Sequence, residues 1–189
     1  SVLRWLRDEA QFFQEYSELD ALVGSVPDAG GVFFVPAFTG LYDPYDDLSA
    51  RGAILGLTFG NKRAHIARAF VESLGFQVRA ILDAIQERTE LTIPQLYLGG
   101  GISNSDAACQ IQADLLGIPT IRLDFAETTA RAAALLAGMG HGQWSDAGQL
   151  PRLANSRFVF QPHLSAQVQA KRLAEWQEAV ARTTNWSKG

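Results

Sequence analysis

The feature that most constrains the fold is a short apolar run that ends in three consecutive glycines and leads into a helical pattern. The run reads Leu96-Tyr-Leu-Gly-Gly-Gly-Ile-Ser-Asn-Ser105, and the helical pattern extends from about Asn104 to Leu116. Glycine lets a backbone approach a ligand closely, and free N–H groups at the start of a helix attract anions. A strand, a glycine turn and a helix in this order predict a phosphate or nucleotide site at Gly99, Gly100 and Gly101.

The glycine turn has a second interpretation, because two well-known phosphate-binding motifs are absent. Neither Gly-x-x-x-x-Gly-Lys-Ser/Thr nor Gly-x-Gly-x-x-Gly occurs in the sequence. A tight turn at the start of a helix has the same composition. Ser103, Asn104 and Ser105 all suit the N-cap of that helix. We expect at least one of them to cap the helix, and a second could form a hydrogen bond to ribose or phosphate.

Composition limits the classes of protein and partner. The chain has 189 residues, of which 47% are apolar and 19% charged, which is typical of one globular domain with a substantial core. Its net charge of −4 and its lack of a basic block argue against nucleic acid and anionic membranes as partners. The apolar runs are too short to cross a bilayer. Cys109 is the single cysteine, so no intramolecular disulfide can form, and we expect a cytoplasmic protein.

The first half of the chain contains one strong helix and a pair of short strands. Ile66, Phe70, Leu74 and Val78 begin an apolar repeat at helical spacing, which predicts a helix from Asn61 to about Arg88. Gly75 interrupts this helix, and we expect it to permit close packing. Before this helix, the pattern predicts a helix over 1–16, a loop over 17–30, a strand over 32–35, a loop over 39–52, and an apolar run over 53–57 that pairs with the first strand.

The second half alternates strands and helices. The pattern predicts strands over 95–98 and 119–123, helices over 104–116 and 128–139, an irregular segment over 143–163, and a final helix over 165–184. This alternation predicts an α/β fold with a largely parallel sheet. Ligands of such sheets bind at the carboxyl ends of the strands, where the three glycines lie.

Three further segments resemble a known family. They are Val35-Pro-Ala-Phe-Thr-Gly-Leu-Tyr-Asp-Pro-Tyr45, Ala50-Arg-Gly-Ala-Ile-Leu-Gly-Leu-Thr58 and His65-Ile-Ala-Arg-Ala-Phe-Val-Glu-Ser73. They are similar to the C-terminal half of the FGGY carbohydrate kinases, and to the glycerol kinases more than to the xylulose- or ribulose-type members. The resemblance continues through the glycine turn and ends in the helix around Trp176, so it covers nearly the whole chain.

The resemblance implies a fold and a separate role for each of two domains. Such kinases have two actin-like (ribonuclease H-like) domains, with a mixed sheet flanked by helices in each. ATP lies mostly against the C-terminal domain, whereas the polyol and the catalytic aspartate lie mostly on the N-terminal side. Residues 1–189 would then be a single nucleotide-binding domain without its first strands, a fragment of a longer two-domain protein. Its partners would be ATP with Mg²⁺, a polyol or sugar, and in some assemblies a second copy of the chain.

The nucleotide contacts of the family carry over only in part. Its Gly-Gly turn falls at Gly100 and Gly101, and Gly99 replaces the usual Asp before the turn. Its nucleotide-contacting Asn falls at Ser105, beside Asn104, and a Gln of the first helix falls at Arg4. Arg4 could therefore lie over adenine or pair with a phosphate, or it could be an ordinary surface arginine. No catalytic residue and no metal ligand is expected within the chain.

Several polar residues have ordinary structural interpretations. Three aspartates in one loop could attract a cation, but Asp-Pro and Asp-Asp are also common turn sequences; they are Asp43, Asp46 and Asp47. The three histidines lack the spacing of zinc ligands. The loop over 39–51 could border a cleft between domains or an oligomer contact.

Two alternatives to a glycerol kinase-like enzyme remain open. The first is a degenerate actin-like module that binds a partner without catalysis, which the replacements at Arg4 and Ser105 suggest. The second is a kinase for another sugar, such as a pentulose.

Overall fold

The computed structural model describes residues 2–123, 127–151 and 157–186. The first half contains α1 (Val2–Asp8), α2 (Tyr16–Gly24), β1 (Phe33–Val35), β2 (Ala53–Leu55) and α3 (Arg63–Thr89). The second half contains β3 (Leu96–Leu98), the 3₁₀ turn η1 (Gly101–Asn104), α4 (Asp106–Leu116), β4 (Thr120–Leu123), α5 (Thr128–Gly140), the 3₁₀ turn η2 (Ala147–Gln149), β5 (Arg157–Phe160) and α6 (Ala166–Ala181).

The strands form two small sheets, and both contribute to the α/β fold. β1 and β2 pair antiparallel with Phe34 opposite Ile54, which confirms the predicted pairing. β3 and β4 pair parallel with Tyr97 opposite Ile121. β5 pairs antiparallel with the other edge of β4, so the described three-stranded sheet is mixed rather than largely parallel. The prediction of an irregular segment over 143–163 was therefore wrong at β5.

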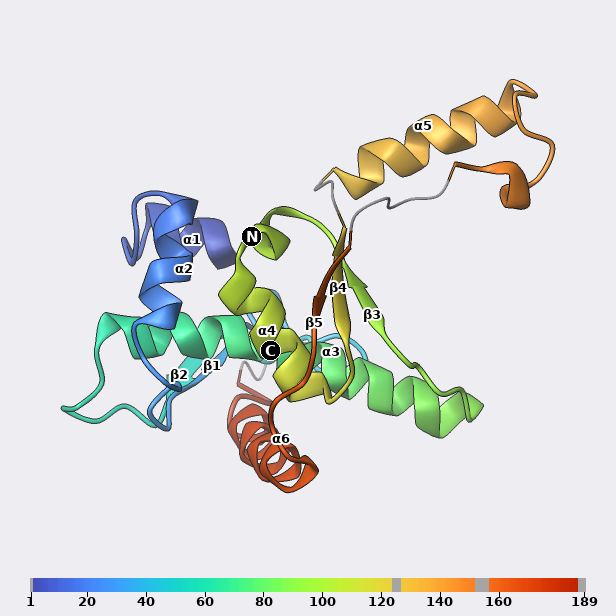
Figure 1. The fold of residues 1–189 in the computed structure, drawn as a ribbon. Coiled ribbons are helices and arrows are strands. Elements are labelled where there is room, and N and C mark those ends of the chain that lie inside the picture. The colour runs from blue at the N-terminus through green and yellow to red at the C-terminus, as the bar shows by residue number, and fades with distance from the viewer. Residues whose placement is uncertain (1, 124–126, 152–156, 187–189) are drawn as a thin grey trace.

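The long helix α3 runs through the centre of the molecule, whereas α5 lies apart from it (Figure 1). α2 and α4 both contact it, as does β1. Gly75 is buried where α4 crosses, and a Cβ atom built there would lie 2.8 Å from Cδ1 of Leu115. The expectation that Gly75 permits close packing is therefore confirmed.

The N-terminal segment differs from its prediction. The helix predicted over 1–16 ends at Asp8, and α2 occupies much of the segment predicted to be a loop. Between the two helices Gln11 adopts a left-handed conformation with φ of 52°, and Phe13 is buried. The apolar repeat is thus satisfied by a turn that buries Phe13 rather than by a continuous helix. The polar residues of α2 obscure the buried pair Leu19 and Val23, which lie one helical turn apart.

Helix α5 projects away from the rest of the molecule beyond the end of the three-stranded sheet (Figure 1). None of its residues is buried. The ring of Trp144 packs against it at Gly138, where a Cβ atom would approach the ring to 2.3 Å. The core lies instead among α1, α2, β1, α3, α4 and α6.

Candidate functional site

The glycine turn borders a groove of about 980 Å³. One wall comes from α1 and α2 and the other from η1, the start of α4 and β4. Leu3, Leu19 and Ile102 give the groove an apolar part, whereas Asp20 and Arg122 belong to its polar part. Of the residues predicted from the sequence, the structure brings together three in this groove, namely Gly101, Asn104 and Ser105.

The three glycines have three different surroundings. Gly100 has φ of 87° and ψ of 173°, a region that essentially only glycine occupies. Gly101 has ordinary dihedral angles, and a Cβ atom built on it meets nothing within 4 Å. Gly99 lies against the start of α5, where a Cβ atom would come within 2.6 Å of Cγ2 of Thr128. Gly99 therefore serves close packing, Gly100 shapes the turn, and Gly101 borders the open groove.

Backbone donors at the turn are available to a ligand. The N–H groups of Gly101 and Ile102 have no acceptor within the described ranges, as expected for the first residues of a helical turn. The carbonyl oxygen of Gly100 is occupied, because it accepts from both N and Oγ of Ser103, at 3.1 and 2.7 Å. The turn thus presents donors rather than acceptors.

Ser105 caps α4, which confirms that one of the three polar residues in the turn serves this role. Its Oγ accepts a hydrogen bond from the N–H of Ala108 at 3.0 Å. The same hydroxyl donates to Oδ1 of Asp20 at 2.5 Å. The N–H of Ala107 also donates to this oxygen, at 3.0 Å. A side chain from α2 therefore completes the cap of a helix that lies more than 80 residues later in the chain.

Arg122 stabilises the opposite side of the groove. Its guanidinium donates to Oδ1 of Asp106 and to the carbonyl oxygen of Ser103. It also stacks on the ring of Phe158, with 4.4 Å between Cζ and the ring centroid. Strands β4 and β5 are thus connected to the start of α4 by one cation. Sequence reasoning missed both Asp20 and Arg122, and no local motif marks either residue.

The remaining predicted residues lie at the margin of the groove. Arg4 is exposed on α1, next to the groove residue Leu3, and is not itself among the lining residues. Gly99 and Gly100 do not line the groove either. Gly99 and Gly100 thus serve packing and turn geometry outside the groove, whereas Gly101 lines it.

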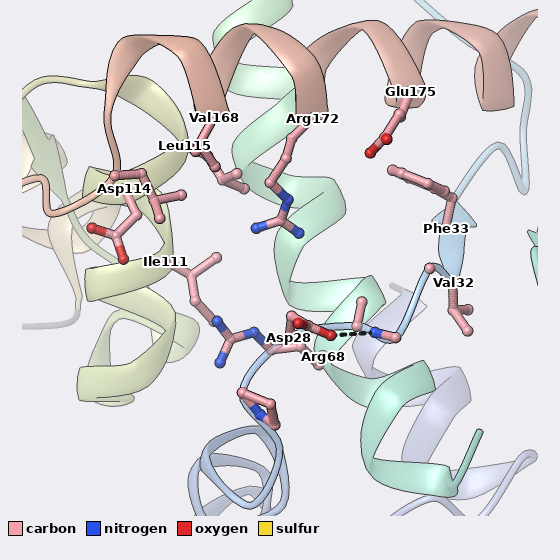
Figure 2. A pocket seen from close by; sticks show the side chains of 15 residues that line it. Asp28, Val32, Phe33, Arg68, Ile111, Asp114, Leu115, Val168, Arg172 and Glu175 are labelled. Atoms are coloured by element: carbon pink, nitrogen blue, oxygen red, sulfur yellow. Dashed lines mark hydrogen bonds between the residues drawn. The ribbon is translucent and has the colours of Figure 1, made fainter. Parts of the chain in front are cut away.

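A second cavity, of about 440 Å³, lies between α3, α4, α6 and the loop before β1. Figure 2 shows the guanidinium groups of Arg68 and Arg172 pointing into it, with Asp114 and Glu175 on opposite sides. Behind these cations Glu72 is 1% exposed. Its Oε1 accepts from Nε of Arg68 at 3.0 Å, and its Oε2 accepts from Nη2 of Arg172.

The charge balance of this second cavity does not favour an anion. Glu72 neutralises one of the two guanidinium charges, and carboxylates at the edge of the cavity outnumber the remaining cation; these are Asp28, Asp114 and Glu175. A buried carboxylate between two arginines also has a direct structural role, because it joins α3 to α6. We therefore assign the groove beside the glycine turn as the candidate functional site.

The cysteine thiol and the loop aspartates, which were also candidate functional groups, have structural roles or are buried. Burial raises the pKa of the Cys109 thiol from 9.0 to about 11, so the thiolate needed of a nucleophile is disfavoured. Asp47 accepts from N and Oγ of Ser49 at 2.8 and 2.6 Å, which confirms its turn role. Asp43 pairs with Arg88. Within the described ranges no three His, Cys, Asp or Glu side chains are close enough to hold a metal ion.

None of the described helices combines the length and the apolar composition needed to cross a membrane.

Comparison with known sequences gives consistent matches. The model of the "FGGY family of carbohydrate kinases, C-terminal domain" matches residues 1–141. A glycerol kinase of Janthinobacterium sp. (strain Marseille) is 43% identical over 186 residues, which are 98% of this chain and 37% of the relative. A glycerol kinase 2 of Sulfolobus acidocaldarius is 40% identical over 188 residues, or 100% of this chain and 38% of the relative.

Solved structures agree with these matches. The crystal structure of Plasmodium falciparum glycerol kinase with ADP superposes with a TM-score of 0.83 at 30% identity, over 97% of this chain and 36% of that one. A xylulose kinase from Rhodospirillum rubrum gives a TM-score of 0.71 at 25% identity, over 95% of this chain and 36% of that one. The actin-like fold expected from the sequence is thereby confirmed.

The chain spans little more than a third of the length of these relatives. The family resemblance first indicated by the Pro-Ala-Phe-Thr-Gly-Leu segment holds over most of its residues. The chain belongs to the FGGY family of carbohydrate kinases and carries its C-terminal domain.

Proposed function

We propose that this chain is the nucleotide-binding half of an ATP-dependent kinase that phosphorylates glycerol or a related polyol. The observation that carries the proposal is the groove beside Gly101, which combines free backbone donors with an apolar wall. Support comes from the glycerol kinase relatives and from the related Plasmodium falciparum glycerol kinase, whose crystal structure contains ADP.

The groove suits the two chemically different ends of a nucleotide. The free N–H groups of Gly101 and Ile102 would bind phosphate oxygens, since backbone donors at a helical start stabilise negative charge. The apolar surface of Leu3 and Ile102 would cover one face of the nucleoside. Phosphoryl transfer depends mainly on such positioning and on charge neutralisation.

Magnesium would be held chiefly by the nucleotide itself. The carboxylate of Asp106 is engaged by Arg122, and one oxygen of Asp20 is engaged by Ser105 and Ala107. Mg²⁺ commonly binds through substrate phosphates and water with only one or two protein carboxylates, so this donor set fits a nucleotide-borne ion. When bound, the ion would neutralise charge on the phosphates. The described groove adds positioning and backbone donors.

The group that takes the proton from the acceptor hydroxyl would lie outside this chain. The relatives are almost three times as long, so a second domain has room to supply that group and the polyol contacts. Closure of the two domains would exclude water from the transferred phosphoryl group. We place the complete kinase in the cytoplasm.

Binding of ADP with Mg²⁺ to the 189-residue chain, measured by calorimetric titration, tests the nucleotide site. We expect measurable heat for the unchanged chain and its loss in Gly101→Leu, because the new side chain would enter the groove. Gly140→Leu is the matched control, since Gly140 also has open space around it but lies at the end of α5. Absence of binding at millimolar ADP would contradict the proposal.

A coupled assay of ADP release with glycerol tests whether the catalytic base and the polyol contacts lie in another domain. The 189-residue chain should show no turnover, whereas a longer protein that contains it together with an N-terminal domain should phosphorylate glycerol. Turnover by the chain alone, well above a blank, would refute the assignment of the base to another domain. Activity of the longer protein on pentuloses but not on glycerol would favour the alternative acceptor, and inactivity on both would favour a non-catalytic binding module.

A further inference from the structure

We propose that Asp20 selects the nucleobase by accepting a hydrogen bond from the exocyclic amino group of adenine. The inference rests on the proposed function, since it assumes a nucleotide in the groove. Asp20 lies on α2, directly after the buried Leu19, and lines the groove from the α2 side. It is a residue to which no local motif pointed.

The two carboxylate oxygens of Asp20 have different surroundings. Oδ1 accepts from Oγ of Ser105 at 2.5 Å and from the N–H of Ala107 at 3.0 Å. Oδ2 has no hydrogen-bond partner in the part of the chain that the structure describes. One oxygen therefore fixes the carboxylate against α4, and the other remains free to accept from a ligand.

Two polar groups beside Asp20 are already engaged within the protein. The hydroxyl of Ser105 has one hydrogen, which it donates to Asp20, so Ser105 has no donor left for a base. The guanidinium of Arg122 is paired with Asp106 and does not neutralise Asp20. This part of the groove thus presents a fixed anionic acceptor.

The charge of Asp20 also orients the ligand. A carboxylate repels phosphate, whereas the N–H groups of Gly101 and Ile102 attract it. A nucleotide would therefore place its phosphates at the turn and the edge of its base near Asp20. The apolar side chains of Leu3 and Ile102 line the same groove and suit the face of a planar ring.

Adenine and hypoxanthine differ at the atom that would meet Asp20. Adenine has an amino group that donates, whereas hypoxanthine has a carbonyl oxygen that faces the carboxylate as a second acceptor. A site built to accept from a ligand donor rejects an analogue that lacks it, because the buried acceptor then stays unpaired or is repelled. We expect the unchanged chain to bind ADP at least about tenfold more tightly than IDP, the fold-change typical of one hydrogen bond to a charged group.

The test compares calorimetric affinities for ADP and IDP in the 189-residue chain and in Asp20→Asn. The amide oxygen of the variant can still accept from Ser105 and Ala107, so the cap survives, but its free group becomes an NH₂ donor. The ADP affinity should fall about tenfold and the ratio of ADP to IDP affinity should approach or pass unity. Asp83→Asn, in the second half of α3 and outside the groove lining, removes the same charge and should leave the ratio unchanged.

Three outcomes separate the possibilities. A changed ratio with an unchanged melting temperature supports Asp20 as the selecting residue. An unchanged ratio in Asp20→Asn overturns the inference and leaves the nucleotide site intact. Binding of neither nucleotide by the unchanged chain contradicts the proposed function and the inference together.

Discussion

The indole nitrogen Nε1 of Trp176 donates a hydrogen bond to the hydroxyl of Tyr45 at 3.0 Å. Trp176 is fully buried in α6, and its ring stacks on Phe76 of α3 with centroids 5.2 Å apart. Burial raises the pKa of Tyr45, and the hydrogen bond from Trp176 opposes that rise. The loop that carries Tyr45 is therefore anchored to the core by this residue rather than exposing it at a surface.

Tyr45→Phe should destabilise the protein by about 1–3 kcal/mol, because it leaves a buried indole N–H without its acceptor. Urea unfolding followed by tryptophan fluorescence measures the free energy of unfolding. Tyr42→Phe is the control, since Tyr42 is 65% exposed and its change should cost less than about 0.5 kcal/mol. Equal losses in the two variants would contradict the structural role of the hydrogen bond.

Glu72→Ala should be among the most destabilising single changes in α3. It leaves the guanidinium groups of Arg68 and Arg172 without their shared carboxylate, and breaking a buried pair costs about 3–5 kcal/mol. Asp83→Ala is the control, because it breaks the ion pair between Arg79 and Asp83 in the same helix. This pair has the same four-residue spacing as the pair of Arg68 with Glu72, but its side chains are partly exposed. Asp83→Ala should cost about 1 kcal/mol or less in the same urea experiment. A loss for Glu72→Ala as small as that would count against the buried network.

Local periodicity allowed several elements to be predicted from the sequence. The apolar repeat predicts the helix α3, and the short apolar runs predict the strands β1 and β2. In each case the pattern involves only residues that are close together in the sequence. Gly75 was expected to allow close packing, and Leu115 is the side chain that fills the space. The glycine turn was likewise recognisable, because strand, glycine and helix follow directly in the chain.

The missed features depend on partners far away in the chain. β5 acquires its ladder of hydrogen bonds only by pairing with β4, and its four residues have no period of their own. Asp20 acts on residues more than 80 positions later, and Arg122 stacks on Phe158. No local pattern marks such contacts, because ordinary polar residues acquire these roles only after the elements meet. The close approach of Gly99 to Thr128 at the start of α5 is a further contact that the local glycine pattern does not reveal.

Gly100→Ala and Gly101→Ala should differ in stability although the residues are adjacent. Gly100 has φ of 87° and ψ of 173°, where a side chain costs about 1–3 kcal/mol. Gly101 has ordinary angles and open space, so its change should alter the free energy of unfolding by less than about 0.5 kcal/mol. Thermal and urea unfolding of both variants check the difference. The opposite order would contradict the described geometry of the turn.

Asp47 should make the protein sensitive to acid. The hydroxyl of Ser49 and then the backbone N–H of Asn185 donate to its carboxylate, and they lower its pKa from 3.8. The N–H of Asn185 lies 2.7 Å from Oδ2, so this carboxylate also holds the turn after α6. Because the pKa is lower in the folded state, Asp47 contributes stability above about pH 4, and this contribution is lost as the pH falls further.

Asp47→Asn separates this contribution from that of the other acids, which are the same in both proteins. The unchanged chain should be the more stable at about pH 7 and pH 5, and the difference should shrink below about pH 4, where the carboxylate becomes protonated. Urea unfolding at matched pH values measures that difference. A difference that stays constant from about pH 7 to pH 3 would show that the charge of Asp47 does not stabilise the turn, and a difference that grows on acidification would reverse the sign expected from its lowered pKa.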